Sequence, residues 1–223
     1  MTTIIHRPPP GTPLLDRVKR ITSDLEDYWF ERKHGLDLGG IIPLSDLTTE
    51  HRDALPHANQ YQATWCSTVR RLMGEAAKTG IAFENFIDIG SGKGKACFYA
   101  ATRPPFRKII GVEFSKELVD IANRNLMKFR SDNIEFIEAD ASRFRLPEAN
   151  NLVFLFNSFD GHLLSVFIET NLAHFQAFDT LIAYSNDLQK ETLTRHGFST
   201  LFRDQKKKMS LFQYPRVQAA AGA

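Results

Sequence analysis

The chain has 223 residues, which suffices for one sizeable α/β domain with a small appendage but not for two domains with separate cores. Hydrophobic residues make up 43% of it and the formal net charge is +2, so no overall field indicates a nucleic acid or an anionic membrane as partner. Two cysteines, Cys66 and Cys97, are too few for a disulfide framework or a metal cluster, and no apolar run reaches the length of a membrane span. We therefore expect a cytoplasmic protein without a bound metal, whose cysteines are small buried hydrophobes.

The N-terminal third is predicted to be a helical appendage or lid over residues 14–80, after an irregular, proline-rich leader over 1–13. Apolar residues recur at spacings of three and four from Leu14 to Trp29, which predicts an amphipathic helix that ends at Gly35 and needs a partner surface. A long loop is expected to follow, and then a second helix over 59–78.

The remainder is predicted to be a single domain over residues 81–216, followed by a short tail over 217–223. Apolar runs predict five strands, at 86–89, 108–113, 134–137, 152–156 and 180–184, with helices between them. Two further strands, at 198–202 and 210–214, are joined by a polar turn and are therefore antiparallel. Alternating strands and helices followed by a hairpin predict an α/β fold, a doubly wound sheet with one reversed strand near its edge.

Three glycines spaced two apart, Gly90, Gly92 and Gly94, end the first strand of this sheet and indicate a nucleotide site. A phosphate-binding P-loop would need a glycine at position 89 and a hydroxyl residue after Lys95, and the chain has neither. A dinucleotide site would need the spacing G-x-G-x-x-G, and a carboxylate as close as Asp88 would repel a pyrophosphate. Asp88 suits a ligand that carries an amine or a sulfonium.

From about residue 60 to 215, the sequence resembles the class I S-adenosylmethionine-dependent methyltransferases. The family pattern is an acid before G-x-G-x-G, a second acid ending the next strand, an Asp after the third strand and a motif ending the fourth. The counterparts here are Asp88 with Gly90, Gly92 and Gly94, then Glu113, then Asp140, then Asn157 to Phe159. The resemblance implies a Rossmann-like doubly wound seven-stranded sheet with an antiparallel terminal hairpin, and S-adenosyl-L-methionine as cofactor.

The resemblance gives the cofactor-binding residues their expected roles. Glu113 is placed to accept hydrogen bonds from both ribose hydroxyls, and Asp140 from the adenine amino group, with the backbone N–H of Ala141 beside it. Asp88 is expected to order the loop amides or the methionine amine. The alternatives are that Glu113 is a solvated helix cap and that Asp140 begins a turn before Ser142. Ser91 and Phe114 complete the expected contacts, whereas Lys93 and Lys95 are interpreted as solvated.

The end of the fourth strand is similar to the Asn-Pro-Pro-Tyr/Phe motif of many N-methyltransferases. In that motif the Asn oxygen, here that of Asn157, accepts from the target amine, and an aromatic ring, here Phe159, packs against the transferring group. Ser158 stands where those enzymes have proline, which removes rigidity. Asp160 and His162 are candidate bases. The alternative is that Asp160 caps the following helix and His162 lies on its surface.

His57, Tyr61 and Thr64 also carry a resemblance. Small bacterial methyltransferase-like proteins place a His and Tyr-x-x-Thr before a D-x-G-S-G-K-G loop and an N-x-F motif, and the non-SET histone-lysine methyltransferases show a distantly similar order. This implies that Tyr61 and Thr64 face the methionine end of the cofactor. The alternative is that Tyr61 and Trp65 are core residues one helical turn apart.

The function predicted from these motifs is methyl transfer from S-adenosylmethionine, N-directed, to a small molecule or a protein amine. Two alternatives remain: a non-catalytic adenosyl-nucleotide-binding protein, and an NAD-dependent oxidoreductase. The only basic run, at residues 203–208, is interpreted as a solvated hairpin turn, so a nucleic-acid substrate is not expected.

Overall fold

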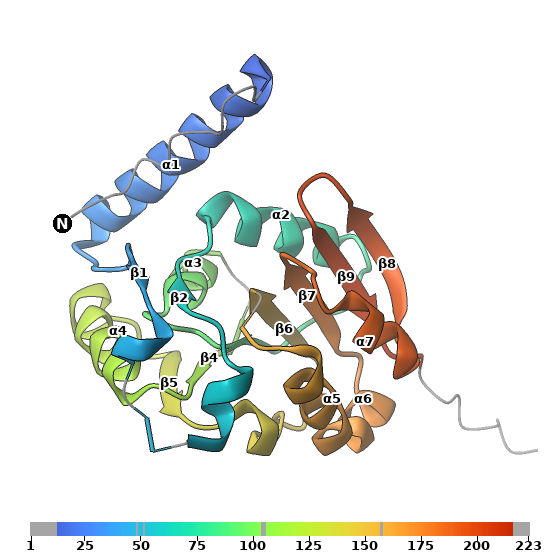
Figure 1. The fold of residues 1–223 in the computed structure, drawn as a ribbon. Coiled ribbons are helices and arrows are strands. Elements are labelled where there is room, and N and C mark those ends of the chain that lie inside the picture. The colour runs from blue at the N-terminus through green and yellow to red at the C-terminus, as the bar shows by residue number, and fades with distance from the viewer. Residues whose placement is uncertain (1–12, 48, 51, 104–105, 157, 216–223) are drawn as a thin grey trace, which may run out of the picture.

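The computed structural model describes residues 13–215 except 48, 51, 104–105 and 157, and its centre is a seven-stranded sheet with helices on both faces (Figure 1). The strands of this sheet are β3 (Asn85–Ile89), β4 (Lys108–Glu113), β5 (Ile134–Glu138), β6 (Asn151–Phe156), β7 (Leu181–Ser185), β8 (Ser199–Asp204) and β9 (Met209–Gln213). The helices that flank it are α2 (Cys66–Ala77), α3 (Lys95–Ala101), α4 (Lys116–Phe129), α5 (Gly161–Thr170), α6 (Leu172–Ala177) and α7 (Lys190–Arg195).

The order across the sheet is β5-β4-β3-β6-β7-β9-β8. β3 lies at the centre and pairs in parallel with β4 on one side and β6 on the other, so that Phe86 is opposite both Ile109 and Leu152. β9 runs antiparallel to both β7 and β8. The predicted doubly wound α/β sheet with an antiparallel terminal hairpin is confirmed. Because the chain builds outward from β3 in both directions, the order reverses there, and ligands of such sheets collect at the carboxyl ends beside that point.

The central strands are buried on both faces, which is why they read as unbroken apolar runs in the sequence. Successive side chains alternate between two cores: Phe86 and Phe154 pack under α2, α3 and α4, while Ile87 and Leu155 pack under α5, α6 and α7. Both cysteines, Cys66 and Cys97, are free and fully buried, as predicted.

A long helix, α1 (Leu14–His34), precedes the domain and ends at Gly35, whose backbone is left-handed with φ +66°. These bounds match the prediction. The apolar stripe that led to the prediction is nevertheless turned outward: Leu14 is 74% exposed and Trp29 63%. Figure 1 shows α1 extending away from the sheet. The surface that this stripe needs does not lie within the described part of the chain.

The opposite, polar face of α1 holds the helix on the domain. Asp24 accepts a hydrogen bond from the indole nitrogen of Trp65 at 3.2 Å, and Asp27 accepts one from the backbone N–H of Cys66 at 2.8 Å. Both aspartates are buried. Buried charges are tolerated when they are paired and hydrogen-bonded, so these contacts fix α1 in a single position on α2.

Between α1 and α2, the chain forms β1 (Ile41–Ile42), the short 3-10 turns η1 (Leu44–Asp46) and η2 (Arg52–His57), and β2 (Tyr61–Gln62). The prediction of a helix from residue 59 is therefore wrong at its start, because α2 begins only at Cys66. The reason is backbone pairing: β2 runs antiparallel to β1, and Ala58 bridges to Phe159. Those pairings keep the segment extended as far as Trp65.

α2 shares the core beneath the sheet through Val69 and Leu72, although the sequence analysis grouped it with the appendage. The division of the chain at residue 80 stays a prediction. The predicted tail and all but residue 13 of the predicted leader lie outside the described residues. None of the described helices combines the length and apolar character needed to cross a membrane.

Candidate functional site

A cavity opens at the carboxyl ends of β3, β4 and β6, beside the point where the strand order reverses. Residues 58–62 form one wall of it. Of the predicted site residues, those that line it are Tyr61, Gly90, Glu113, Phe114, Asp140, Ala141 and Phe159. Asn59 and Gln60 line it as well and were not predicted. Three amide side chains around one tyrosine, at 59, 60 and 62, were the available signal.

The three glycines of the loop all have positive φ, which ordinary residues avoid. The loop is also approached closely from outside. A Cβ on Gly92 would lie 2.2 Å from the ring of Tyr61, and one on Gly90 would lie 2.4 Å from the hydroxyl of Ser158. Glycine is therefore required at positions 90 and 92 for two reasons. The backbone there has positive φ, and the side chains of Ser158 and Tyr61 leave no room for a Cβ.

Glu113 is the last residue of β4, and its carboxylate is hydrogen-bonded to the backbone of the glycine loop. One carboxylate oxygen accepts from the backbone N–H of Gly92 at 2.8 Å, and the other from the N–H of Ser115 at 3.1 Å. Burial raises the pKa of this carboxyl, and the backbone hydrogen bonds partly oppose the rise. Each oxygen of a carboxylate can accept more than one hydrogen bond, so Glu113 keeps acceptor capacity on the cavity side.

Asp88 lies under the loop and is 4% exposed. Its closest described polar contact is the thiol of Cys97, at 3.8 Å. Burial raises the pKa of Asp88 to about 8, and the nearby charge of Glu113 adds to the rise. A cationic group placed next to this carboxyl would lower its pKa and favour its ionised form.

Asp140 begins the short 3-10 turn η3 (Ala141–Arg143), where its side chain accepts from the backbone N–H of Ser142 at 2.8 Å. The turn-forming alternative is therefore correct. It does not exclude the ligand-binding one, because Asp140 and Ala141 both line the cavity. Phe114 lies in the same wall, next to Glu113.

The ring of Tyr61 faces the glycine loop at Gly92, and its hydroxyl donates to the backbone oxygen of Leu38 at 2.7 Å. Nearby polar atoms lack such partners. The hydroxyls of Thr64 and Ser91 are buried, and neither has a hydrogen-bond partner among the described residues. Buried polar atoms are normally satisfied, so these two hydroxyls are exceptions, although neither residue lines the cavity.

Lys93 and Lys95 are buried, which contradicts their interpretation as solvated. Lys95 pairs with Asp27 at 2.5 Å and Glu31 at 3.0 Å, both on α1. Burial lowers the pKa of Lys95, but these two carboxylates outweigh it, so the pKa lies above its ordinary value. Spacing along the chain gave no signal for these pairs, because they join segments more than 60 residues apart.

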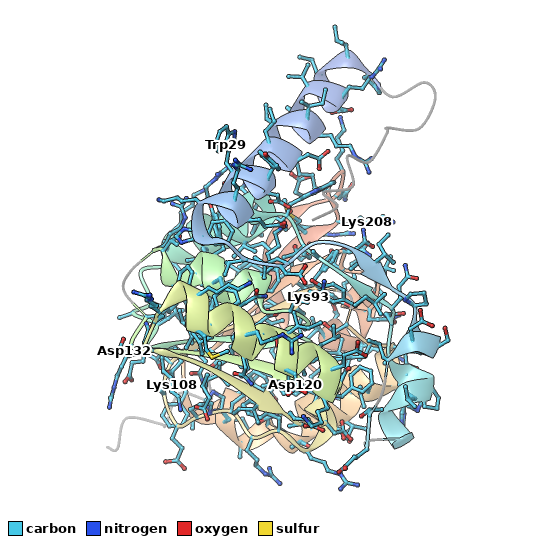
Figure 2. The ribbon with its side chains drawn as sticks, turned by 90° about the vertical axis from the view of Figure 1, so that its left-hand side faces the viewer. Trp29, Lys93, Lys108, Asp120, Asp132 and Lys208 are labelled. Carbon is cyan, nitrogen blue, oxygen red and sulfur yellow. The ribbon has the colours of Figure 1, made fainter. Side chains whose placement is uncertain are left out.

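Lys93 ties a second part of the N-terminal segment to the same loop. Its ammonium donates to the backbone oxygen of Gly39 at 2.8 Å and lies 3.3 Å from Asp37. Figure 2 shows Lys93 beneath the chain that leaves α1. The two lysines thus attach the outer side of the loop to the N-terminal segment.

The predicted acceptor motif lies at the end of β6. Asn157 lies outside the described residues. Phe159 is 6% exposed and lines the cavity. The hydroxyl of Ser158 donates to the backbone oxygen of Ile89 at 2.7 Å, so the serine ties β6 to β3. The expected loss of rigidity at this position is therefore offset by a hydrogen bond that proline could not make.

Asp160 caps α5, because one of its oxygens accepts from the backbone N–H groups of His162 and Leu163. Its other oxygen lies 2.8 Å from Nδ1 of His57, and the rings of His57 and His162 are 4.8 Å apart. Burial raises the pKa of Asp160, but the contacts from Leu163, His57 and His162 outweigh it, so the pKa lies below its ordinary value.

None of these three side chains is part of the described cavity lining, although Phe159 is. Neighbouring side chains of an extended segment point to opposite faces, so a ring turned into the cavity leaves the next side chain turned away from it. The structure thus brings Asp160 and His162 together with His57 beside the cavity rather than in its wall.

A second cavity adjoins the first, with which it shares Phe156 and residues 58–60 and 62. It extends toward Leu44 and toward Asn186, which follows β7. Its described lining holds no ionisable side chain and several amides. Across the described residues, no group of three or more His, Cys, Asp or Glu could hold a metal ion.

A family model for a methyltransferase domain matches residues 83–208. Among curated proteins, no sequence matches the chain. Solved structures share the fold. A candidate RNA methyltransferase from Pyrococcus horikoshii is 21% identical, with 79% of this chain and 94% of that chain covered and a TM-score of 0.54. The glycopeptide N-methyltransferase MtfA, in complex with S-adenosyl-L-methionine, is 13% identical, with 66% and 94% covered and a TM-score of 0.51.

Proposed function

Since the chain belongs to the methyltransferase-domain family, we propose that it transfers a methyl group from S-adenosylmethionine to a nitrogen of a small molecule or of a protein amine. The cofactor is S-adenosylmethionine. The observation that carries the proposal is the meeting of Glu113, Asp140 and the glycine loop around one cavity, with Asp88 beneath that loop. When bound, the cofactor supplies a methyl group on a cationic sulfonium, which a nucleophile displaces in line.

The chemistry of the chain's own residues suits this cofactor. Glu113 and Asp140 would accept hydrogen bonds from its ribose and adenine, while Phe114 packs beside them. Asp88, whose pKa is raised by burial, would ionise beside the methionine amine. The ring of Tyr61 covers the loop at Gly92.

The acceptor would enter through the second cavity and reach the reacting methyl group beside Phe159. Asn157 would accept a hydrogen bond from the target amine, as the resemblance to N-methyltransferases implies. The amides of Asn59, Gln60 and Asn186 suit a neutral, polar acceptor, because an ion without a counter-charge would be costly to desolvate there.

Deprotonation of the acceptor is assigned to solvent. Along the described lining of both cavities, the ionisable side chains are Tyr61, Glu113 and Asp140, all on the cofactor side. Burial raises the pKa of Tyr61 far above its usual range, so it stays protonated. The rate should therefore rise with pH through the pKa of the acceptor itself. Asp160 acts as a positioning residue that caps α5 and orients His57.

Calorimetric titration of the full chain with S-adenosylmethionine, S-adenosylhomocysteine and NAD tests the cofactor. We expect the first two to bind and NAD not to bind. Tight NAD binding without S-adenosylhomocysteine binding would indicate an oxidoreductase and refute the proposal.

Methyl transfer is tested with cofactor labelled on its methyl group and a panel of small amines and exposed-lysine peptides. We expect Asn157→Ala to abolish transfer while cofactor binding stays within a few-fold of that of the unmodified chain. The matched control is Asn123→Ala, since Asn123 is an exposed residue of α4. Equal transfer by both variants would remove Asn157 from the mechanism, and binding without transfer to any acceptor would favour a non-catalytic binding protein.

A further inference from the structure

The outer face of α1 is an apolar stripe that the rest of the described chain leaves exposed. Its central residues follow one another at spacings of four and three: Leu14, Val18, Ile21, Leu25 and Tyr28. Their exposure runs from 38% to 74%. Leu15 and Trp29 widen the stripe at its two ends, and Figure 2 shows Trp29 on the side of α1 away from the sheet. Alternation of four and three is the spacing of helices that pair with other helices.

The polar face of α1 is the one that docks on the domain, so the stripe cannot turn inward without breaking buried ion pairs. Lys95 is 5% exposed and is held by Asp27 and Glu31 of that face. Removing one partner of such a buried pair is strongly unfavourable. The stripe therefore stays at the surface, and its partner lies outside the described part of the chain.

The extent of the stripe matches that of a specific protein interface. Seven apolar side chains that are roughly half exposed present on the order of 100 Å² each, or about 700 Å² per chain, close to the ~800 Å² per partner of a standard interface. Soluble monomers seldom leave apolar patches of this size uncovered.

The charged side chains of α1 are divided between its faces. All five acidic side chains of the helix are buried or half-buried, whereas the exposed ones, Arg17, Lys19, Arg32 and Lys33, are basic. Interfacial membrane helices also carry exposed lysine and arginine, so the test of the stripe includes anionic vesicles.

We propose that the stripe pairs with the same stripe of a second copy of this chain, so that the protein is a two-fold symmetric dimer through antiparallel α1 helices. With Ile21 opposite Leu25 of the second copy, Val18 lies opposite the copy's Tyr28. The slender aliphatic end at Leu15 then lies beside the bulky end at the copy's Trp29. One surface patch complements itself in this way, which is the requirement of a two-fold interface.

Light scattering during size-exclusion chromatography of the full chain tests the dimer. We expect the mass of two chains for the unmodified protein, and the mass of one chain for the double variant Ile21→Glu/Leu25→Glu with unchanged helix content by circular dichroism. Met127→Glu is the matched control, because Met127 is an exposed apolar residue of α4, 72% exposed and outside the stripe, and it should stay dimeric. A monomeric unmodified chain, or one that binds anionic vesicles through the stripe, overturns the proposal.

Oxidative cross-linking tests the antiparallel direction. Both native cysteines are fully buried, so an introduced cysteine reports alone. Thr22 lies near the two-fold axis of the antiparallel pair, whereas the two copies of Leu14 lie at opposite ends. Thr22→Cys should therefore cross-link to itself, and Leu14→Cys should not. Efficient cross-linking of Leu14→Cys would indicate parallel helices and refute the proposed arrangement.

Discussion

The two halves of the sheet's carboxyl edge differ in how firmly their polar groups are held. On the β3–β5 side, Asp88, Glu113 and Asp140 are more than nine-tenths buried. On the β6–β7 side, the side chains of His57 and Asp160 are 31% and 44% exposed. The first half is organised before any ligand arrives, whereas the second presents amides and half-exposed groups that tolerate variation. This contrast explains why a sequence can define a cofactor more sharply than an acceptor.

The largest effect is expected from replacing Lys95, which joins the cofactor side of the domain to α1. Lys95→Met leaves Asp27 and Glu31 as buried carboxylates without a counter-charge, so we expect the free energy of unfolding to fall by about 3–5 kcal/mol. Urea denaturation measures it. Lys78→Met removes an exposed ion pair with Glu75 and should change stability by less than about 1 kcal/mol. Equal losses in the two variants would contradict the importance of the buried lysine.

The second prediction concerns the pH dependence of stability. Because the pKa of Asp88 is about 8 in the folded chain and near its ordinary value of 3.8 when unfolded, the folded state holds a proton that the unfolded state releases between these values. The contribution of Asp88 to stability is therefore present at low pH and is lost as pH rises toward 8, by on the order of a few kcal/mol.

The isosteric variant Asp88→Asn isolates this effect from the other titrating groups. We expect its advantage in unfolding free energy over the unmodified chain to grow from pH 4 to pH 8 and then level off. Urea denaturation at several pH values checks it. A difference between the two proteins that is independent of pH would show that Asp88 is ionised in the folded state.

A smaller effect is expected for Glu113→Gln. The variant keeps the shape of the side chain but weakens hydrogen bonds that involve a charged acceptor, each of which is worth about 1.5–3 kcal/mol. S-adenosylmethionine affinity should therefore fall roughly 10- to 100-fold by calorimetry. Glu138→Gln, at the end of β5 but outside the described lining of both cavities, is the control and should bind normally. Equal affinities would mean that Glu113 only shapes the loop.

Much of the fold and of the cofactor half could be predicted from the sequence, because both depend on local patterns. Apolar runs, the glycine spacing and an acid at each strand end are all short-range signals, and Glu113 and Asp140 do line one cavity. The pairing of Lys95 with α1 and of His57 with Asp160 could not be predicted, since each joins segments distant in the chain. The helix α1 was predicted correctly, but its orientation on the domain could not be, because periodicity identifies an apolar face and not what covers it.

The smallest effect tests the connection between the two halves. Ser158→Ala removes the hydrogen bond to the backbone oxygen of Ile89 and should lower the unfolding free energy by about 1 kcal/mol. Ser165→Ala, which removes only a bond within α5, is the control. Because Ser158 also approaches Gly90, its loss loosens the acceptor strand against the loop, so methyl transfer should fall more than cofactor affinity does. If both fell equally, the serine would support the cofactor loop alone, and the two halves would be less separate than their burial indicates.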